Sequence, residues 1–194
     1  MKKVLLFLAQ GFEAFEAAAF TDVFGWTKYS NEFVKLETTS LRTELKCTWS
    51  LIVKPEIPFS EKMFENYDAL AIPGGFESAG FYEDAFDERF LQLIRKFDEQ
   101  KKPIAAICVG ALPVAKSGVL KNRNATTYDL DEGKWRKKLS DLGANVKNKS
   151  LVVDKNIITS TGPVTSLDVA FELLEMLTNK KNVETVKKLM RITN

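Results

Sequence analysis

Three short runs of apolar residues constrain the fold of this chain more than any other feature. Apart from Lys3 itself, Lys3–Ala9 is continuously apolar, and so are Ala69–Ile72 and Ile104–Ile107. Runs of this length without polar alternation are typical of strands buried on both faces of a parallel sheet. Segments with helical periodicity separate them, so the sequence predicts a doubly wound α/β fold.

The other elements follow the same alternation of strand and helix. Further strands are expected at Glu32–Thr39, Asn124–Tyr128, Val146–Asp154 and Asn156–Thr161. Helices are expected at Glu13–Lys28, Asp87–Gln100, Gly133–Leu142, Thr165–Leu177 and Val183–Arg191, and from the turn after Cys108 toward Lys116. The period-two pattern of Leu41–Lys54 predicts a small β-hairpin excursion, with Leu45, Cys47, Trp49, Leu51 and Val53 on its apolar face.

Length and composition narrow the class of protein. The 194 residues and a hydrophobic content of 45% suit a single domain over residues 1–194 with a real core. A net charge of +2 gives no case for a nucleic acid or a membrane as partner, and no apolar run approaches the ~20 residues of a membrane span. The apolar stretch after Lys3 is short for a secretion signal and lacks a cleavage site, so we expect a cytoplasmic protein.

The absence of histidine is the most discriminating fact of the composition. The chain has two cysteines, Cys47 and Cys108, and no histidine. This excludes Ser-His and Cys-His catalytic pairs, imidazole bases and histidine metal sites. Two cysteines are too few for a disulfide framework or a zinc site, and we expect neither a metal nor another cofactor.

Cys108 lies where a buried strand ends and a helix begins. Such an elbow lifts a nucleophile toward substrate, and the amides and dipole of a helix start favour thiolate over thiol. We therefore expect Cys108 to be a reactive thiolate. A lone cysteine in an apolar run is more often an inert buried side chain, and this second interpretation stays open at this point.

Two further loops share the sheet edge of Cys108, because loops after parallel strands meet in one crevice. Glu16 has apolar neighbours, which would raise its pKa and let it donate a hydrogen bond to a thiolate or relay a proton. An equal alternative is that Glu16 only stabilises the start of its helix by interacting with the helix dipole. Gly74 and Gly75 either direct their amides into an oxyanion hole or form a simple turn. The aromatic residues near this edge, which shape an apolar pocket or pack a dimer surface, are Phe12, Phe76, Phe81 and Tyr82.

Together these motifs resemble the ThiJ/PfpI superfamily, whose glutamine-amidotransferase-like domains include protein deglycase and the PfpI proteases. The resemblance runs nearly end to end and rests on Ala9–Glu16, Asp68–Gly75, Ala105–Gly110, Ala125–Tyr128 and Thr159–Ser166. It implies a flavodoxin-like fold and a homodimer. It also implies Cys108 as the elbow nucleophile and Glu16 as its acid, with the amides of Gly75 and Val109 as oxyanion donors.

Three positions depart from the pattern of that superfamily. Val109 stands where the protease-like branch has histidine, and Tyr128 stands where the deglycase-like branch has histidine. Thr161 stands where an arginine often follows a serine. A Cys-His peptidase is therefore disfavoured. Tyr128 is an auxiliary candidate as a hydrogen-bond donor, but an ordinary pKa near ~10 makes it a poor base at neutral pH.

Two active functions and one inactive interpretation remain. In the first, the Cys108 thiolate adds to a small electrophile in a glyoxalase-, deglycase- or hydratase-like reaction, and Glu16 moves the proton. In the second, Cys108 responds to oxidative stress by oxidation to a sulfenic or sulfinic acid that Glu16 stabilises. In the third, the chain is a scaffold without catalysis.

Overall fold

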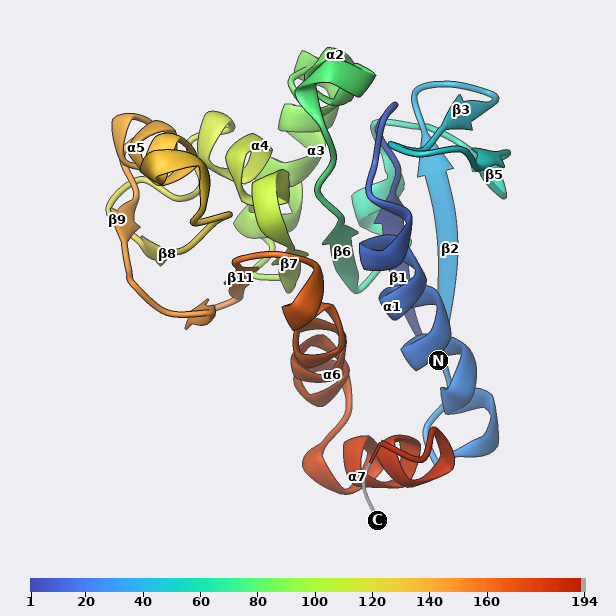
Figure 1. The fold of residues 1–194 in the computed structure, drawn as a ribbon. Coiled ribbons are helices and arrows are strands. Elements are labelled where there is room, and N and C mark those ends of the chain that lie inside the picture. The colour runs from blue at the N-terminus through green and yellow to red at the C-terminus, as the bar shows by residue number, and fades with distance from the viewer. Residues whose placement is uncertain (193–194) are drawn as a thin grey trace.

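The central sheet has seven strands in the structure, a computed structural model that describes residues 1–192. The strands are β1 (Lys2–Phe7), β2 (Val34–Ser40), β5 (Ile57–Pro58), β6 (Ala69–Ile72), β7 (Ile104–Ala106), β10 (Leu151–Asp154) and β11 (Ile157–Ser160). Their spatial order is β10-β11-β7-β6-β1-β2-β5 (Figure 1). Neighbours pair in parallel except β10, which is antiparallel to β11. Counting β1, β2, β6, β7 and β11 as strands one to five gives the flavodoxin-like order 2-1-3-4-5.

Helices cover both faces of this sheet, as the sequence predicts. On one face, α1 (Ala14–Trp26) packs against α6 (Ser166–Leu177), and α7 (Lys180–Leu189) contacts both (Figure 1). On the other face lie α3 (Glu88–Glu99) and α4 (Ala111–Lys116). Two further helices, α2 (Phe81–Ala85) and α5 (Lys134–Asp141), lie beyond the sheet. Among residues 1–192, no helix is long and apolar enough to cross a membrane.

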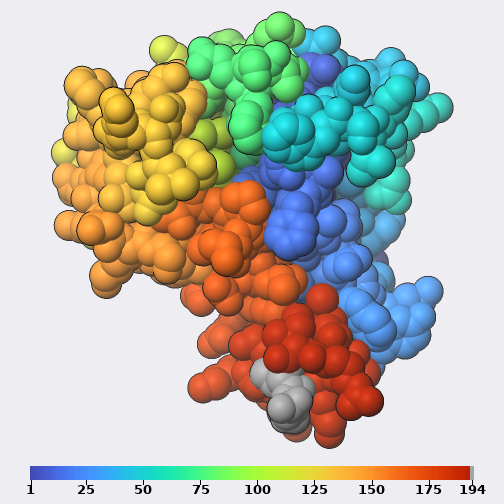
Figure 2. Space-filling view, viewed as in Figure 1, coloured from blue at the N-terminus to red at the C-terminus, as the bar shows by residue number. Residues whose placement is uncertain are grey.

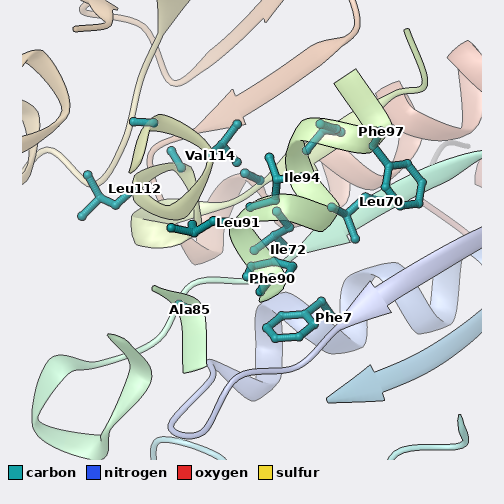
Figure 3. Close-up of a cluster of buried hydrophobic side chains, with 14 of the residues drawn as sticks. Phe7, Leu70, Ile72, Ala85, Phe90, Leu91, Ile94, Phe97, Leu112 and Val114 are labelled. Carbon is teal, nitrogen blue, oxygen red and sulfur yellow. The ribbon is translucent and has the colours of Figure 1, made fainter. Parts of the chain in front are cut away.

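Successive residues of the buried strands feed two separate cores, which explains their continuous apolar character. The core beneath α3 and α4 takes Leu5, Phe7, Leu70, Ile72, Ile104 and Ala106 from the strands. The core beneath α1 and α6 takes Val4, Leu6, Ala69, Ala71, Ala105 and Ile107. In the first core, the rings of Phe7 and Phe90 stack with centroids 3.6 Å apart (Figure 3). Each large apolar side chain contributes ~1.5–3 kcal/mol on burial, so both cores hold rigid the strands that position the loops at the sheet edge.

Leu41–Lys54 does not form the regular hairpin that its alternation predicts. Only β3 (Leu45–Lys46) and β4 (Ile52–Val53) pair, in an antiparallel ladder of two residues each. Cys47 is buried as expected, and its Sγ accepts the N–H of Leu51. Residues 48–50 form a bend that breaks the alternation. Trp49 and Leu51 are therefore exposed, at 65% and 58%, rather than on a buried face.

Other differences from the predicted elements are local. Val146–Asp154 is divided, because β9 (Asn145–Val146) pairs with β8 (Asn124–Ala125) in a small parallel sheet while β10 joins the main sheet. The short elements β5 and α2 have no periodic pattern and were not predicted. Helix α7 starts earlier than predicted because Asn179 caps it, accepting the N–H of Asn182. A single domain over 1–194 stays a prediction, and residues 193 and 194 lie outside the described residues.

Candidate active site

The candidate site lies where the strand order of the sheet reverses. The loop after β1 enters α1, and the loops after β6 and β7 carry Gly74 and Cys108 beside it. In open α/β sheets, ligands bind in the crevice at this switch point. A cavity of about 300 Å³ opens here, and Cys108, Glu16, Gly75 and Val109 are among the residues that line it. The structure therefore brings the main residues predicted from sequence into one place.

Cys108 occupies a strained elbow of the backbone. A 3-10 turn over Cys108–Gly110 connects β7 to α4, and the φ of Cys108 is +56°, in the left-handed region that non-glycine residues rarely adopt. The Thr127 hydroxyl donates a 2.8 Å hydrogen bond to the Cys108 carbonyl and holds the turn. A Cβ at Gly110 would lie 2.8 Å from the carbonyl oxygen of Ile72. The elbow can pack against the end of β6 only because glycine stands there.

Glu16 is a fully buried carboxyl in the first turn of α1. The N–H of Gly74 donates a 2.6 Å hydrogen bond to its Oε2. Within residues 1–192 its Oε1 has no conventional hydrogen-bond partner, so this oxygen is available to the neighbouring Cys108 thiol. Burial, reinforced by repulsion from Glu13, raises the pKa of Glu16 to about 8. The carboxyl is therefore largely protonated at neutral pH, as its apolar setting predicts.

The surroundings of Cys108 work against the resting thiolate expected from the sequence, and that thiolate stays a prediction. Burial of the sulfur, followed by repulsion from the Glu16 carboxyl, raises the pKa of the Cys108 thiol above its ordinary value. The N–H of Val109 lowers this pKa, as a helix start should, but its effect is smaller. Helix α4 has only six residues, so its dipole is weak. Because the pKa of both groups is raised, the Cys108–Glu16 pair holds its protons more tightly than two exposed groups would, and a proton must leave the pair before the sulfur attacks.

Gly74 does not serve as an oxyanion donor, contrary to expectation. Its N–H is committed to Oε2 of Glu16. The lack of a side chain matters as well, because a Cβ at Gly74 would lie 2.9 Å from the Cβ of Cys108 and 3.0 Å from Oε2 of Glu16. Gly74 is therefore a positioning residue that lets the carboxyl and the thiol approach each other.

Gly75 lies opposite Phe12 in an isolated antiparallel bridge. The flanking hydrogen bonds run from the N–H of Glu13 to the Gly74 carbonyl and from the N–H of Phe76 to the Gly11 carbonyl. This bridge does not use the N–H of Gly75, and Gly75 lines the cavity. Gly75 and Val109 as oxyanion donors stay predictions.

The cavity walls contain residues that sequence reasoning missed. Trp49, from the bend between β3 and β4, and Trp135, from α5, both line the cavity. In Figure 2 the cyan surface around residues 45–60 and the yellow surface around α5 stand on opposite sides of the molecule's upper half. Trp135 is the one aromatic residue of Lys134–Asp141, a stretch in which Leu139 is the only other apolar side chain, and this is the signal that could have marked it.

The four aromatic residues singled out from sequence have separate places. Phe76 lines the cavity. Phe12 and Phe81 are buried in the two cores, and Tyr82 packs against Phe86 and Trp135. Tyr128 also lines the cavity beside Gly162, where a Cβ would lie 3.6 Å from its ring. The role of Tyr128 as an auxiliary donor stays a prediction.

Comparison with known proteins decides the family. A model described as the DJ-1/PfpI family matches residues 2–176. The chain belongs to the DJ-1/PfpI family. This confirms the resemblance found in the motifs, and the fold agrees: the crystal structure of Drosophila melanogaster DJ-1beta superimposes with a TM-score of 0.84 at 25% identity, covering 100% of this chain and 99% of that one.

Relatives within the DJ-1/PfpI family differ in name and length. Drosophila melanogaster dj-1beta is 28% identical over 191 residues, which cover 96% of this chain and 95% of that protein. Arabidopsis thaliana DJ-1 homolog B is 32% identical over 174 residues, covering 89% of this chain but 37% of that protein, so the chain spans under two fifths of its length. A Bacillus subtilis protein named putative cysteine protease YraA is 31% identical over 162 residues, with 84% and 90% covered.

Proposed function

We propose that the protein is a cysteine-dependent enzyme in which Cys108 adds to a small electrophilic carbon, such as the aldehyde carbon of an α-oxoaldehyde. The observation that carries this proposal is the pairing of Cys108 with the Glu16 carboxyl, whose pKa is raised to about 8, in a cavity open to a ligand. Because the two groups interact, the pair loses its first proton as a unit. The remaining negative charge is then available on sulfur during attack, and no histidine is needed.

The proposed reaction balances with water as the only co-reactant. The sulfur bonds to the aldehyde carbon while Glu16 gives its proton to the aldehyde oxygen, which forms a hemithioacetal. The Glu16 carboxylate takes the hydrogen of that carbon as a proton and returns it to the neighbouring carbonyl carbon, and the hydroxyl proton moves to the neighbouring oxygen. One carbon is oxidised to a thioester and the other is reduced to an alcohol. Water, deprotonated by Glu16, then breaks the carbon–sulfur bond and releases a 2-hydroxy acid.

Backbone amides support this chemistry in the proposal. The N–H groups of Gly75 and Val109 face the developing negative charge on the substrate oxygen, with Tyr128 as an auxiliary hydrogen-bond donor. Preorganised donors of this kind contribute roughly 10²–10³ each to the rate. The bridge between Phe12 and Gly75 and the Thr127 hydrogen bond keep this backbone fixed before substrate arrives.

Redox sensing is the second candidate. Cys108 is a free cysteine, half-buried as a whole residue, beside a protonated carboxyl that would stabilise a sulfinic acid. Its raised pKa disfavours oxidation at neutral pH, because the thiolate is the form that reacts with peroxide. A Cys-His peptidase has no histidine to use.

We also propose a homodimer in the cytoplasm. Phe15, at the start of α1, and Val164, in the 3-10 turn just before the neighbouring helix α6, are 59% and 90% exposed. A second copy that covers these side chains would remove apolar surface from water near the site. Sedimentation of wild type against Phe15→Glu would test this, with a monomer expected for the variant.

The reaction is tested by following methylglyoxal loss and 2-hydroxy acid formation. Cys108→Ser and Glu16→Gln should each lower kcat/KM at least ~100-fold, while Cys47→Ala is the matched control because Cys47 lies outside the cavity lining. Wild-type protein without turnover, but gaining one or two oxygen atoms at Cys108 in dilute peroxide, would support redox sensing instead. Absence of both would leave a scaffold.

A further inference from the structure

The walls of the Cys108 cavity are aromatic. Trp49, Phe76, Tyr128 and Trp135 line it, and they come from four separate segments of the chain. The rings of Trp49 and Phe76 touch, with centroids 5.3 Å apart and planes inclined by 57°. These two side chains are 65% and 46% exposed. Covering large aromatic rings that are exposed to water at a cavity with an apolar group lowers the free energy, so such rings favour an apolar ligand.

The charged groups at this cavity disfavour an anionic ligand. The ionisable acids in its lining are Glu13, Glu16 and Glu77, and no lysine or arginine of residues 1–192 lines it. The faces of aromatic rings also carry negative potential. A carboxylate or phosphate entering the cavity would lose water and find no cationic side chain among the residues that line it.

A cationic ligand is not favoured either. Of the three acids, Glu16 is largely neutral at pH 7 because its pKa is about 8. Glu13 is the N-cap of α1, where its side chain accepts the N–H of Phe15 and faces the positive end of the helix dipole. Glu77 is exposed, where solvent screens its charge. Two ammonium groups already stand over Trp135, those of Lys134 at 4.5 Å and Lys138 at 5.5 Å from the ring centroid. They supply positive charge next to the wall, although they do not line the cavity.

We propose that the substrate is an uncharged α-oxoaldehyde whose second substituent is an aryl or branched alkyl group, seated against Trp49, Phe76 and Trp135. This rests on the proposed function, because the aldehyde carbon must reach Cys108 in the same cavity. The volume of about 300 Å³ is at the lower end for small-molecule sites and suits a single ring. Because even one added methylene in an apolar pocket changes discrimination by about 10-fold or more, a phenyl group should be preferred to a methyl group by at least that factor.

Binding without chemistry tests the pocket separately from the reaction. In Cys108→Ser, tryptophan fluorescence is titrated with acetophenone, benzoate and benzyltrimethylammonium, which share a phenyl ring and differ in charge. We expect acetophenone to bind at least ~10-fold more tightly than benzoate, and Trp49→Ala in the same background to weaken it ~5-fold or more. Trp26→Ala is the matched control, because Trp26 packs on Tyr29 away from the cavity lining. The assignment would be overturned if benzoate bound as tightly as acetophenone, or if benzyltrimethylammonium bound ~10-fold more tightly than acetophenone.

Turnover tests the substrate class directly. The kcat/KM values for phenylglyoxal, methylglyoxal and glyoxylate are compared. The rate measured with Cys108→Ser is subtracted from each, which removes the reaction of phenylglyoxal with arginine side chains. The ratio of kcat/KM for phenylglyoxal to kcat/KM for methylglyoxal should be ~10-fold lower in Trp49→Ala than in wild type, and unchanged in Trp26→Ala. Trp49→Arg places a cation on the wall and should raise glyoxylate turnover ~10-fold or more.

The outcomes separate the two proposals. Cys108-dependent methylglyoxal turnover with the same substrate ratio in wild type and Trp49→Ala overturns the aromatic assignment and leaves the reaction standing. Acetophenone binding that depends on Trp49, without turnover of any α-oxoaldehyde, supports an apolar ligand and rejects the α-oxoaldehyde.

Discussion

The N–H of Gly74 donates a 2.6 Å hydrogen bond to Oε2 of Glu16. This single bond ties the loop after β6 to the helix after β1 and fixes the carboxyl beside the thiol that follows β7. It occupies one carboxyl oxygen and leaves Oε1 for exchange of a proton with Cys108. The segments that follow three parallel strands, β1, β6 and β7, thus meet at the buried carboxyl of Glu16.

Gly74→Ala should disturb this arrangement, because the added Cβ would lie 2.9 Å from the Cβ of Cys108. We expect unfolding in urea to show a loss of ~1–3 kcal/mol, as for other overpacked sites, and alkylation of Cys108 to slow at least ~10-fold. Gly25→Ala is the control, because nothing lies within 4 Å of a Cβ there and the residue is helical. That control should be neutral or stabilising by up to ~1 kcal/mol. Equal reactivity in Gly74→Ala and wild type would contradict the positioning role.

The free energy of unfolding of Glu16→Gln, relative to that of wild type, should increase as pH rises. The folded-state pKa of Glu16 is about 8, above its ordinary value of 4.5, so the folded protein keeps a proton that the unfolded chain releases. This group's contribution to stability is complete below pH 4.5 and declines as pH rises toward 8. Between pH 4.5 and 7 the free energy of unfolding of Glu16→Gln, relative to wild type, should rise by about 3 kcal/mol.

Urea titrations at several pH values measure this difference. Asp22→Asn on the same helix is the control, because Asp22 is exposed, and its difference from wild type should change little over this range. A Glu16→Gln difference that is constant with pH would mean that the carboxyl ionises as easily in the folded protein as in the unfolded chain.

Thr127→Val should loosen the elbow while conserving shape. It removes the 2.8 Å hydrogen bond to the Cys108 carbonyl at a residue that is fully buried. We expect a loss of ~1–2 kcal/mol in unfolding free energy, together with slower alkylation of Cys108. Thr185→Val on exposed α7, where the hydroxyl bonds to the Lys181 carbonyl, should change stability by less than ~0.5 kcal/mol. If both variants behave alike, the Thr127 bond has no special part in holding the elbow.

Much of the fold could be predicted because local pattern and tertiary structure agree. Ala69–Ile72 is the strand that its continuous apolar run predicts, and its alternate residues feed two cores. The meeting of Glu16 with Cys108 followed from one rule, that loops after parallel strands share an edge. The raised pKa of Glu16 followed from its apolar neighbours.

The missed features depend on contacts between segments distant in sequence. The pKa of Cys108 is raised first by burial and then by repulsion from Glu16, which a count of helix-start amides does not describe. Trp49 reaches the cavity only because residues 48–50 bend, and Trp135 arrives on the polar helix α5. In the sequence, Gly74 is one residue of a Gly-Gly pair that predicts only a turn. The folded structure shows that its N–H donates a hydrogen bond to Glu16.

The most direct test of the Cys108–Glu16 pair is the rate of Cys108 alkylation by iodoacetamide as a function of pH, followed by mass spectrometry in wild type and Glu16→Gln. The pair should lose its first proton near the Glu16 pKa of about 8. The wild-type rate should therefore rise about tenfold per pH unit below that value and level off above it. Glu16→Gln should show no inflection there, because burial still raises the pKa of its thiol. A wild-type rate that is already flat from pH 6, or identical profiles for the two proteins, would contradict a shared proton as the switch that activates the sulfur.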